Sequence, residues 1–422
     1  MIEGLGVDLK HIYVHGCICV VSYMNAEALL RAVQYYDTPA LLRFDPSLFR
    51  GKEIILTDEG NGARLPLLAM AIQEACTTRF GRRHIPDDGE KFLEILVKHC
   101  HLDVNKPFEI HRRPSLPSVI SNEAYNTHKY PKRHVAVMQA TDVSCLIWTN
   151  PLSWAFYLFL EKNKRFVINY RDSIVSLLRL GAHVNSPFFF QITRGRMNPA
   201  EDMEWNARNG QSFLHLALES GDCNLVSSLL DARAKFNLAH DRGSLAKCIA
   251  NVKIRDRDPE IVMLVIFKQL VKYFQNGHFD AADLQVLRSS DPTNGNTALH
   301  YLALYEEFQD CRAYIDFLLD ILASPFARNH EGLTPLDVSE NTSTGETPKK
   351  QAFREVLGDA MQRWGDLVMR TMAIHEALEA RGIPEETQED IYGRVSGALQ
   401  IAGSMSRAAL IKGGIMAARN SV

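Results

Sequence analysis

One stretch of the chain, residues 206–237, limits the fold more than any other feature because it combines a turn with two short helical patterns. Asn209-Gly210 suits a tight turn with positive φ, so it predicts the tip of a β-hairpin. Ser212 can cap a helix that starts directly after it, and Gly221-Asp222 ends that helix. A second helical pattern then carries apolar residues at Leu225, Val226, Leu229 and Leu230. The stretch therefore predicts a turn followed by two short helices.

The same pattern recurs along the chain. Asn294-Gly295 precedes Thr297 and His300 much as Asn209-Gly210 precedes Ser212 and His215. Partial copies in the same register lie at Leu65–Ala71, Pro151–Ala155, Arg242–Ala250 and Glu331–Asp337. This set resembles the ankyrin repeat, in which a turn, a T-P-L-H-x-A box and a helix pair recur about every 33 residues. The resemblance covers residues 58 to 360.

The resemblance implies a fold dominated by α-helices, an ankyrin-repeat α-solenoid of about six irregular repeats. Residues 58–345 would hold the repeats, with insertions at 106–143 and 186–204. Residues 1–57 show no turn-and-box pattern and are expected to form an N-terminal cap or a small α/β segment. Residues 346–422 are expected to form a C-terminal helical hairpin and tail, because Phe353, Leu357 and Trp364 keep helical spacing there.

Composition narrows the possible partners. The chain of 422 residues is 46% hydrophobic and 23% charged, as in folded soluble proteins. Its net charge of −3 gives no reason to expect nucleic acid as a partner. The apolar run Pro151–Leu160 is half the length of a membrane span, so no membrane span is expected. The eight cysteines show no metal-type pairs and the N-terminus shows no secretory signal, so we expect a cytoplasmic protein.

Candidate catalytic groups are few. Ser212/His215 and Thr297/His300 look like catalytic pairs, but in the resemblance they join a turn to a helix start. A zinc site or a Cys–His hydrolase centre would draw on His11, His15, Cys17 and Cys19. The spacing of these four residues is not that of common structural zinc sites. The sequence therefore predicts no catalytic residues, no metal site and no cofactor.

The resemblance implies a scaffold that binds a protein partner through its turn tips and its concave helical face. The expected contact residues are those of the tips: Arg208, Asn209, Asp241, Arg242, Thr293, Asn294, Asn329 and His330. A monomer is favoured over a dimer. The alternative is an enzyme with a Cys/His hydrolase-like N-terminal region that recruits its substrate through the repeats.

The irregular repeats and long insertions also resemble the ankyrin effectors that intracellular bacteria inject into host cells. That resemblance would place the chain in the host cytoplasm, acting on a host protein. An ordinary eukaryotic adaptor is the other interpretation.

Overall fold

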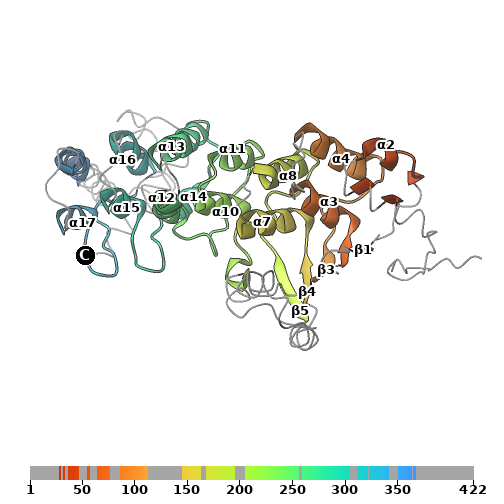
Figure 1. Ribbon diagram of the computed structural model, residues 1–422. Coiled ribbons are helices and arrows are strands. Elements are labelled where there is room, and N and C mark those ends of the chain that lie inside the picture. The colour runs from red at the N-terminus through yellow and green to blue at the C-terminus, as the bar shows by residue number, and fades with distance from the viewer. Residues whose placement is uncertain are drawn as a thin grey trace, which may run out of the picture. The chain divides into compact units, whose positions relative to one another are not determined.

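A computed structural model of the chain describes the greater part of its helical body (Figure 1). The described residues are 28–29, 32–33, 37–46, 55–57, 64–76, 86–112, 145–162, 168–194, 205–255, 259–304, 311–321, 323–341, 350–363 and 365–366. Helices dominate this part of the chain. The cysteine and histidine candidates of residues 11–19 lie outside it.

The chain separates into two compact units, Met1–Gly210 and Gln211–Val422. The expected boundaries at residues 57 and 345 separate a cap and a C-terminal extension from the repeats, and they stay predictions. Each unit is described below by itself.

The first unit contains a five-stranded antiparallel sheet in which each strand pairs with the next along the chain. Its strands are β1 (Ile55–Thr57), β2 (Arg64–Pro66), β3 (Phe108–Arg112), β4 (Cys145–Thr149) and β5 (Phe190–Arg194). Ile110 pairs with Ile147 and Thr149 with Phe190, and all four side chains are fully buried. Side chains alternate across a strand, so Trp148 points to the opposite face, where it is 37% exposed.

Two strands of this sheet lie in segments that the sequence analysis describes only as insertions. Strand β3 lies in the expected insertion 106–143, and β5 lies in the expected insertion 186–204. The prolines of the first insertion exclude a continuous helix, yet they leave room for a strand at the insertion's start.

Five helices of the first unit pack on one another, and α3 packs on β1 and β2 of the sheet (Figure 1). They are α2 (Thr38–Leu41), α3 (Leu67–Cys76), α4 (Pro86–Lys98), α7 (Pro151–Lys162) and α8 (Ile168–Arg179). Tyr157 of α7 stacks on Trp154 at 5.1 Å and on Phe190 of β5 at 4.4 Å between ring centroids. The indole N–H of Trp154 donates to the carbonyl of Ala69 at 3.2 Å, so this buried polar atom is satisfied. The aromatic cluster thus joins the helices to the sheet.

The second unit consists of helix pairs packed in two rows (Figure 1). One row contains α10 (Phe213–Ser220), α12 (Ser244–Arg255), α15 (Ala298–Leu304) and α17 (Pro335–Asn341), each packed on the next. The other row contains α11 (Cys223–Asp231), α13 (Pro259–Gln275) and α16 (Cys311–Asp320). Helix α11 packs on α13, and the ring of Phe267 on α13 meets Tyr314 of α16 at 4.4 Å. A further helix, α14 (Ala281–Arg288), packs on α12.

The ends of α10 and α11 follow from the residues that the sequence singles out. Ser212 caps α10 by accepting the N–H of His215, and Gly221 ends the helix with a φ of 74°. Asp222 then caps α11 by accepting the N–H of Leu225. The expected turn-helix-helix order and the apolar stripe of Leu225, Val226, Leu229 and Leu230 are confirmed.

Residues 350–363 form a helix that belongs to the second unit. Its Phe353 and Leu357 are buried, as expected for the C-terminal extension, and Arg363 pairs with Asp316 of α16 at 2.9 Å. Trp364 and the expected second helix of the hairpin lie outside the described residues.

Candidate functional site

Three turns of the second unit lie next to one another and precede α12, α15 and α17. We call residues 237–243 the first turn, 289–296 the second turn and 324–333 the third turn. All of them belong to the part of the chain that the structure describes.

Asp241 organises the first turn from the inside. One carboxylate oxygen accepts the N–H of Ser212 at 3.0 Å and the other accepts the N–H of Asn237 at 2.6 Å. The side chain is fully buried. The prediction that Asp241 contacts a partner is therefore wrong, because both oxygens of its buried carboxylate already accept backbone N–H groups.

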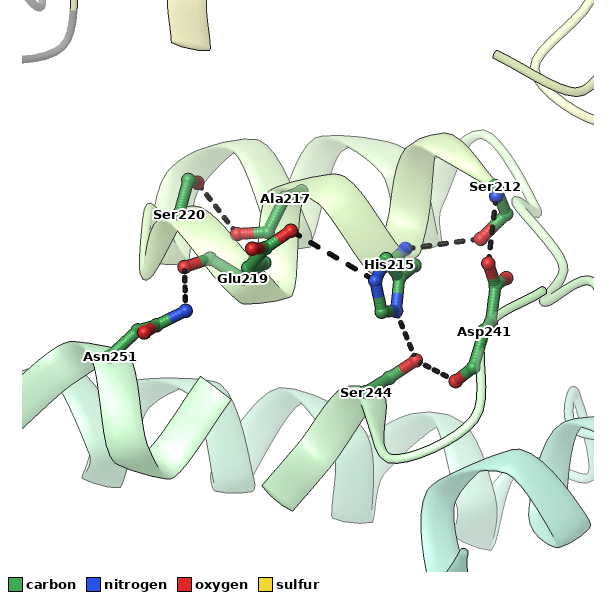
Figure 2. A network of polar contacts seen from close by, with 8 residues as sticks. All are labelled: Ser212, His215, Ala217, Glu219, Ser220, Asp241, Ser244 and Asn251. Carbon is green, nitrogen blue, oxygen red and sulfur yellow. Dashed lines mark hydrogen bonds and ion pairs between the residues drawn. The ribbon is translucent and has the colours of Figure 1, made fainter. Parts of the chain in front are cut away.

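A polar network beneath the first turn joins α10 to α12 (Figure 2). The imidazole Nδ1 of His215 lies 2.6 Å from the hydroxyl of Ser244, and that hydroxyl donates to the carbonyl of Asp241. The carboxylate of Glu219 lies 4.0 Å from the other ring nitrogen of His215. Serine, histidine and carboxylate thus follow the order of a catalytic triad.

The network nevertheless forms a structural link. His215 and Ser244 are both fully buried, so no substrate reaches the hydroxyl. The serine's proton is already committed to the Asp241 carbonyl, and the imidazole is held as a donor rather than as a base. This agrees with the interpretation of Ser212 and His215 as residues that tie the turn to the helix.

The second turn is held by Asp291, which is 6% exposed. Its carboxylate accepts the N–H of Thr293 at 3.0 Å and the hydroxyl proton of Tyr301 at 3.1 Å. The predicted contact residue Asn294 is half-buried, and its side chain donates to the Tyr301 oxygen at 2.8 Å. Thr293 is exposed. In this turn Thr293 is therefore exposed, whereas the Asn294 side chain is engaged within the turn and with Tyr301.

Hydrogen bonds connect the neighbouring turns directly. The N–H of Gly243 in the first turn donates to the hydroxyl of Ser289 at 2.7 Å. The N–H of His330 in the third turn donates to the carbonyl of Asn294 at 2.9 Å. The amide of Asn329 donates to the side-chain oxygen of Asn296 at 2.9 Å. These bonds fix the three turns relative to one another.

The outward residues of the turns include several that sequence reasoning missed. Of the predicted contact residues here, Arg242, Thr293 and His330 are exposed, whereas Asn329 is half-buried. The exposed residues that were not predicted include Leu238 (36% exposed), Phe326 (45% exposed), Ala239, His240, Pro292, Arg328 and Glu331. The signal that could have found Leu238 and Phe326 is a large apolar residue inside a turn, where burial is not expected.

Arg208 and Asn209 belong to the first unit, and Asn209 takes a different role from the one expected. The Asn209 side chain accepts the N–H of Phe190 at 2.7 Å and donates to the carbonyl of Phe190 at 2.9 Å. Asn209 is therefore a side-chain partner for β5, and the expected hairpin tip is corrected. The guanidinium of Arg208 lies 5.6 Å from the ring centroid of Trp205.

Burial and hydrogen bonds shift the pKa of several groups in the fold. Burial lowers the pKa of His300, although its hydrogen bond to the Leu333 carbonyl and the charge of Asp337 act against that shift. Hydrogen bonds from Thr334 lower the pKa of Asp337, which stands where His300 stands in the preceding repeat. Burial raises the pKa of Cys100 to about 11 and that of Cys248 to about 12, so neither thiol is a ready nucleophile.

Within the described residues, no three His, Cys, Asp or Glu side chains are grouped in a way that could hold a metal ion. Nor is any helix there both long enough and apolar enough to cross a bilayer.

Comparison with known proteins adds no further constraint. No protein-family model matches the chain, and no curated protein matches it significantly in sequence.

Proposed function

We propose that this chain is a protein-binding scaffold of the ankyrin-repeat type, and that its three linked turns hold a partner protein. The recurring turn-and-box pattern supports the repeat assignment, and so do the two rows of packed helices in the second unit. A stack of repeats offers its row of turns as an extended surface, which suits recognition of another protein.

The observation that carries the proposal is the set of hydrogen bonds within and between these turns. An acidic or amide side chain holds each turn from inside, and the second turn is bonded to both of its neighbours. Exposed side chains on such turns are already positioned before a partner binds. Less conformational entropy is then lost on binding, which favours affinity.

Site-specific photo-crosslinking tests the proposal. A photoreactive phenylalanine analogue would replace Thr293 or His330 on the turns, and Lys268 or Arg312 on α13 and α16 as exposed controls. We expect one protein from a cell extract to be captured from both turn positions and from neither control. Capture from the control positions alone, or equally from all four, would contradict a turn-centred binding surface.

A second variant separates binding from folding. Ser212→Ala removes the cap of α10 and should lower stability by about 1 kcal/mol. Because Ser212 is 6% exposed, crosslinking from position 293 should persist at temperatures where this variant stays folded. If the cap variant loses the adduct while still folded, the roles assigned to turn and box residues are wrong.

A further inference from the structure

In the three turns the two aspartates are buried, whereas the arginines are exposed. The acidic residues Asp241 and Asp291 are buried, and their carboxylates hold backbone N–H groups and the Tyr301 hydroxyl. Arg242 and Arg328 are exposed, as are the imidazoles of His240 and His330. Glu331 is the exposed acid within these turn residues. The outward face of the turns is therefore basic although the whole chain has a net charge of −3.

The first and third turns repeat one outward pattern. Leu238, Ala239, His240 and Arg242 are exposed in the first turn, and Asp241, which lies between the last two, is buried. Phe326, Arg328 and His330 are exposed in the third turn, with the spacing of Leu238, His240 and Arg242. In both turns an apolar residue comes first and two basic side chains follow.

In both turns the residue between the two basic positions is less exposed than they are. In the first turn it is Asp241, which is fully buried against backbone amides. In the third turn it is Asn329, whose oxygen accepts the N–H groups of Glu331 and Leu333 and whose amide reaches Asn296. The polar residue that holds each turn together thus leaves its basic neighbours on the outside.

One of the cations is already oriented. The Arg328 guanidinium donates to the carbonyl of Gly332 at 2.6 Å within its own turn. A guanidinium has five N–H donors in a fixed plane, so this bond leaves others for a carboxylate. Its side chain therefore loses less rotational freedom on binding than a fully mobile arginine would.

We propose that the three turns bind an acidic protein segment that carries apolar residues among its carboxylates. The two arginines would receive the carboxylates, and Leu238 and Phe326 would receive the apolar side chains. The second turn, whose exposed residues Pro292 and Thr293 carry no charge, lies between the two basic turns. This inference rests on the proposed function and names the chemistry of the partner.

The test uses the full chain and a display library of random 12-residue peptides. Peptides that bind are sequenced, and the tightest one is synthesised with a fluorescent label and titrated by anisotropy at 50 and 200 mM NaCl. We expect enrichment of Asp and Glu together with Leu or Phe. We also expect binding to weaken about tenfold or more at the higher salt, as attraction between exposed charges does.

Two charge-reversed proteins localise the effect. The double change Arg242→Glu with Arg328→Glu should weaken binding by roughly tenfold or more. The matched control, Lys268→Glu with Lys272→Glu on α13, removes the same formal charge from exposed positions and should change binding less than about twofold. A peptide whose acidic residues are replaced by Lys should bind the double arginine variant more tightly than it binds the unmodified protein. This reversal of preference would not occur if the two arginines only stabilised the fold.

The outcomes separate the two proposals. Turn-dependent binding of neutral or basic peptides would overturn the acidic partner and keep the binding surface. If peptide binding is unchanged in the double turn variant but weakened in the α13 variant, the three turns are not the binding surface.

Discussion

The imidazole Nδ1 of His215 is the donor in its 2.6 Å hydrogen bond to the hydroxyl of Ser244. A carbonyl can only accept, so the proton of Ser244 goes to the Asp241 carbonyl and the imidazole supplies the other one. His300, in the corresponding place of the repeat around Thr297, does the reverse. Its Nδ1 accepts the N–H of Thr297 at 3.1 Å, and its Nε2 lies 2.9 Å from the Leu333 carbonyl. His215 therefore carries a proton on Nδ1, whereas the Nδ1 of His300 is an acceptor.

This arrangement predicts a pH dependence of stability that depends on His300. Its pKa is lowered in the fold, mainly by burial, so the unfolded chain binds a proton there more readily. The contribution of His300 to stability is complete above the unfolded pKa of about 6.5 and is lost as the pH falls through the window below it.

Urea unfolding at pH 7.5 and 5.5 measures this effect. The parent should lose more free energy of unfolding on acidification than His300→Gln does, because the glutamine does not titrate. Equal losses in the two proteins would show that His300 keeps its ordinary pKa in the fold.

Gly295 should be intolerant of a methyl group. Its φ is 76°, and an added Cβ would lie 2.6 Å from the His330 ring and 2.7 Å from the His330 backbone nitrogen. Gly332 has a φ of 78°, but nothing lies within 4 Å of an added Cβ. Both changes to Ala incur a backbone cost of about 1 kcal/mol. Gly295→Ala should lose about 1–3 kcal/mol more, from overpacking against the third turn.

Denaturant titration of the two glycine variants decides the point. Similar free energies of unfolding for Gly295→Ala and Gly332→Ala would mean that the second and third turns do not touch as described.

Asp283 should matter far more than its neighbour Asp280. The Asp283 carboxylate is almost fully buried and accepts the N–H of Phe236 at 3.0 Å and the Lys235 ammonium at 2.8 Å. Asp283→Ala leaves a buried amide without a partner and should cost about 3 kcal/mol. Lys235 is 37% exposed, so water can solvate its ammonium group in the variant, and this limits the loss of stability.

Asp280→Ala is the comparison. Asp280 is 60% exposed and caps α14, so its loss should cost about 1 kcal/mol. Thermal or urea unfolding of both variants tests the ranking, and a reversed order would contradict the anchoring role of Asp283.

Cys248 should resist alkylation in the native protein. Its burial raises the pKa of the thiol to about 12 from an ordinary value of 9.0, so its thiolate fraction at pH 8 is about a thousandth of the usual one. Iodoacetamide labelling followed by mass spectrometry should modify Cys248 only in urea. The half-buried Cys223 is the internal reference. Labelling of Cys248 at the same rate as Cys223 without denaturant would show an open interior at α12.

The local parts of this fold were predictable from sequence because their causes are local. Ser212, Gly221 and Asp222 set the ends of α10 and α11 within a few residues, and the apolar spacing of α11 needs no distant partner. Helix α14 was missed, although Asp280 and Asp283 form a capping box whose three-residue spacing is visible in the sequence.

The sheet was not predictable in the same way. Its strands have three to five residues, too few for a clear alternation. Arg112 pairs with Cys145 across a long interval of sequence, and Phe190 pairs with Thr149 across another. For the candidate surface, the sequence identified the turns but not which of their residues are exposed. A motif identifies turn residues, but tertiary packing decides that Asp241 points inward and Arg242 outward.

Asn209 has a consequence for how molecules of this protein meet each other. Its side-chain amide occupies both the N–H and the carbonyl that Phe190 turns away from β4. At that position the rim of the sheet is already closed, so a strand from a second molecule finds no open pair of backbone groups to join. One asparagine thus acts there as a guard against the edge-to-edge growth that leads antiparallel sheets into fibres.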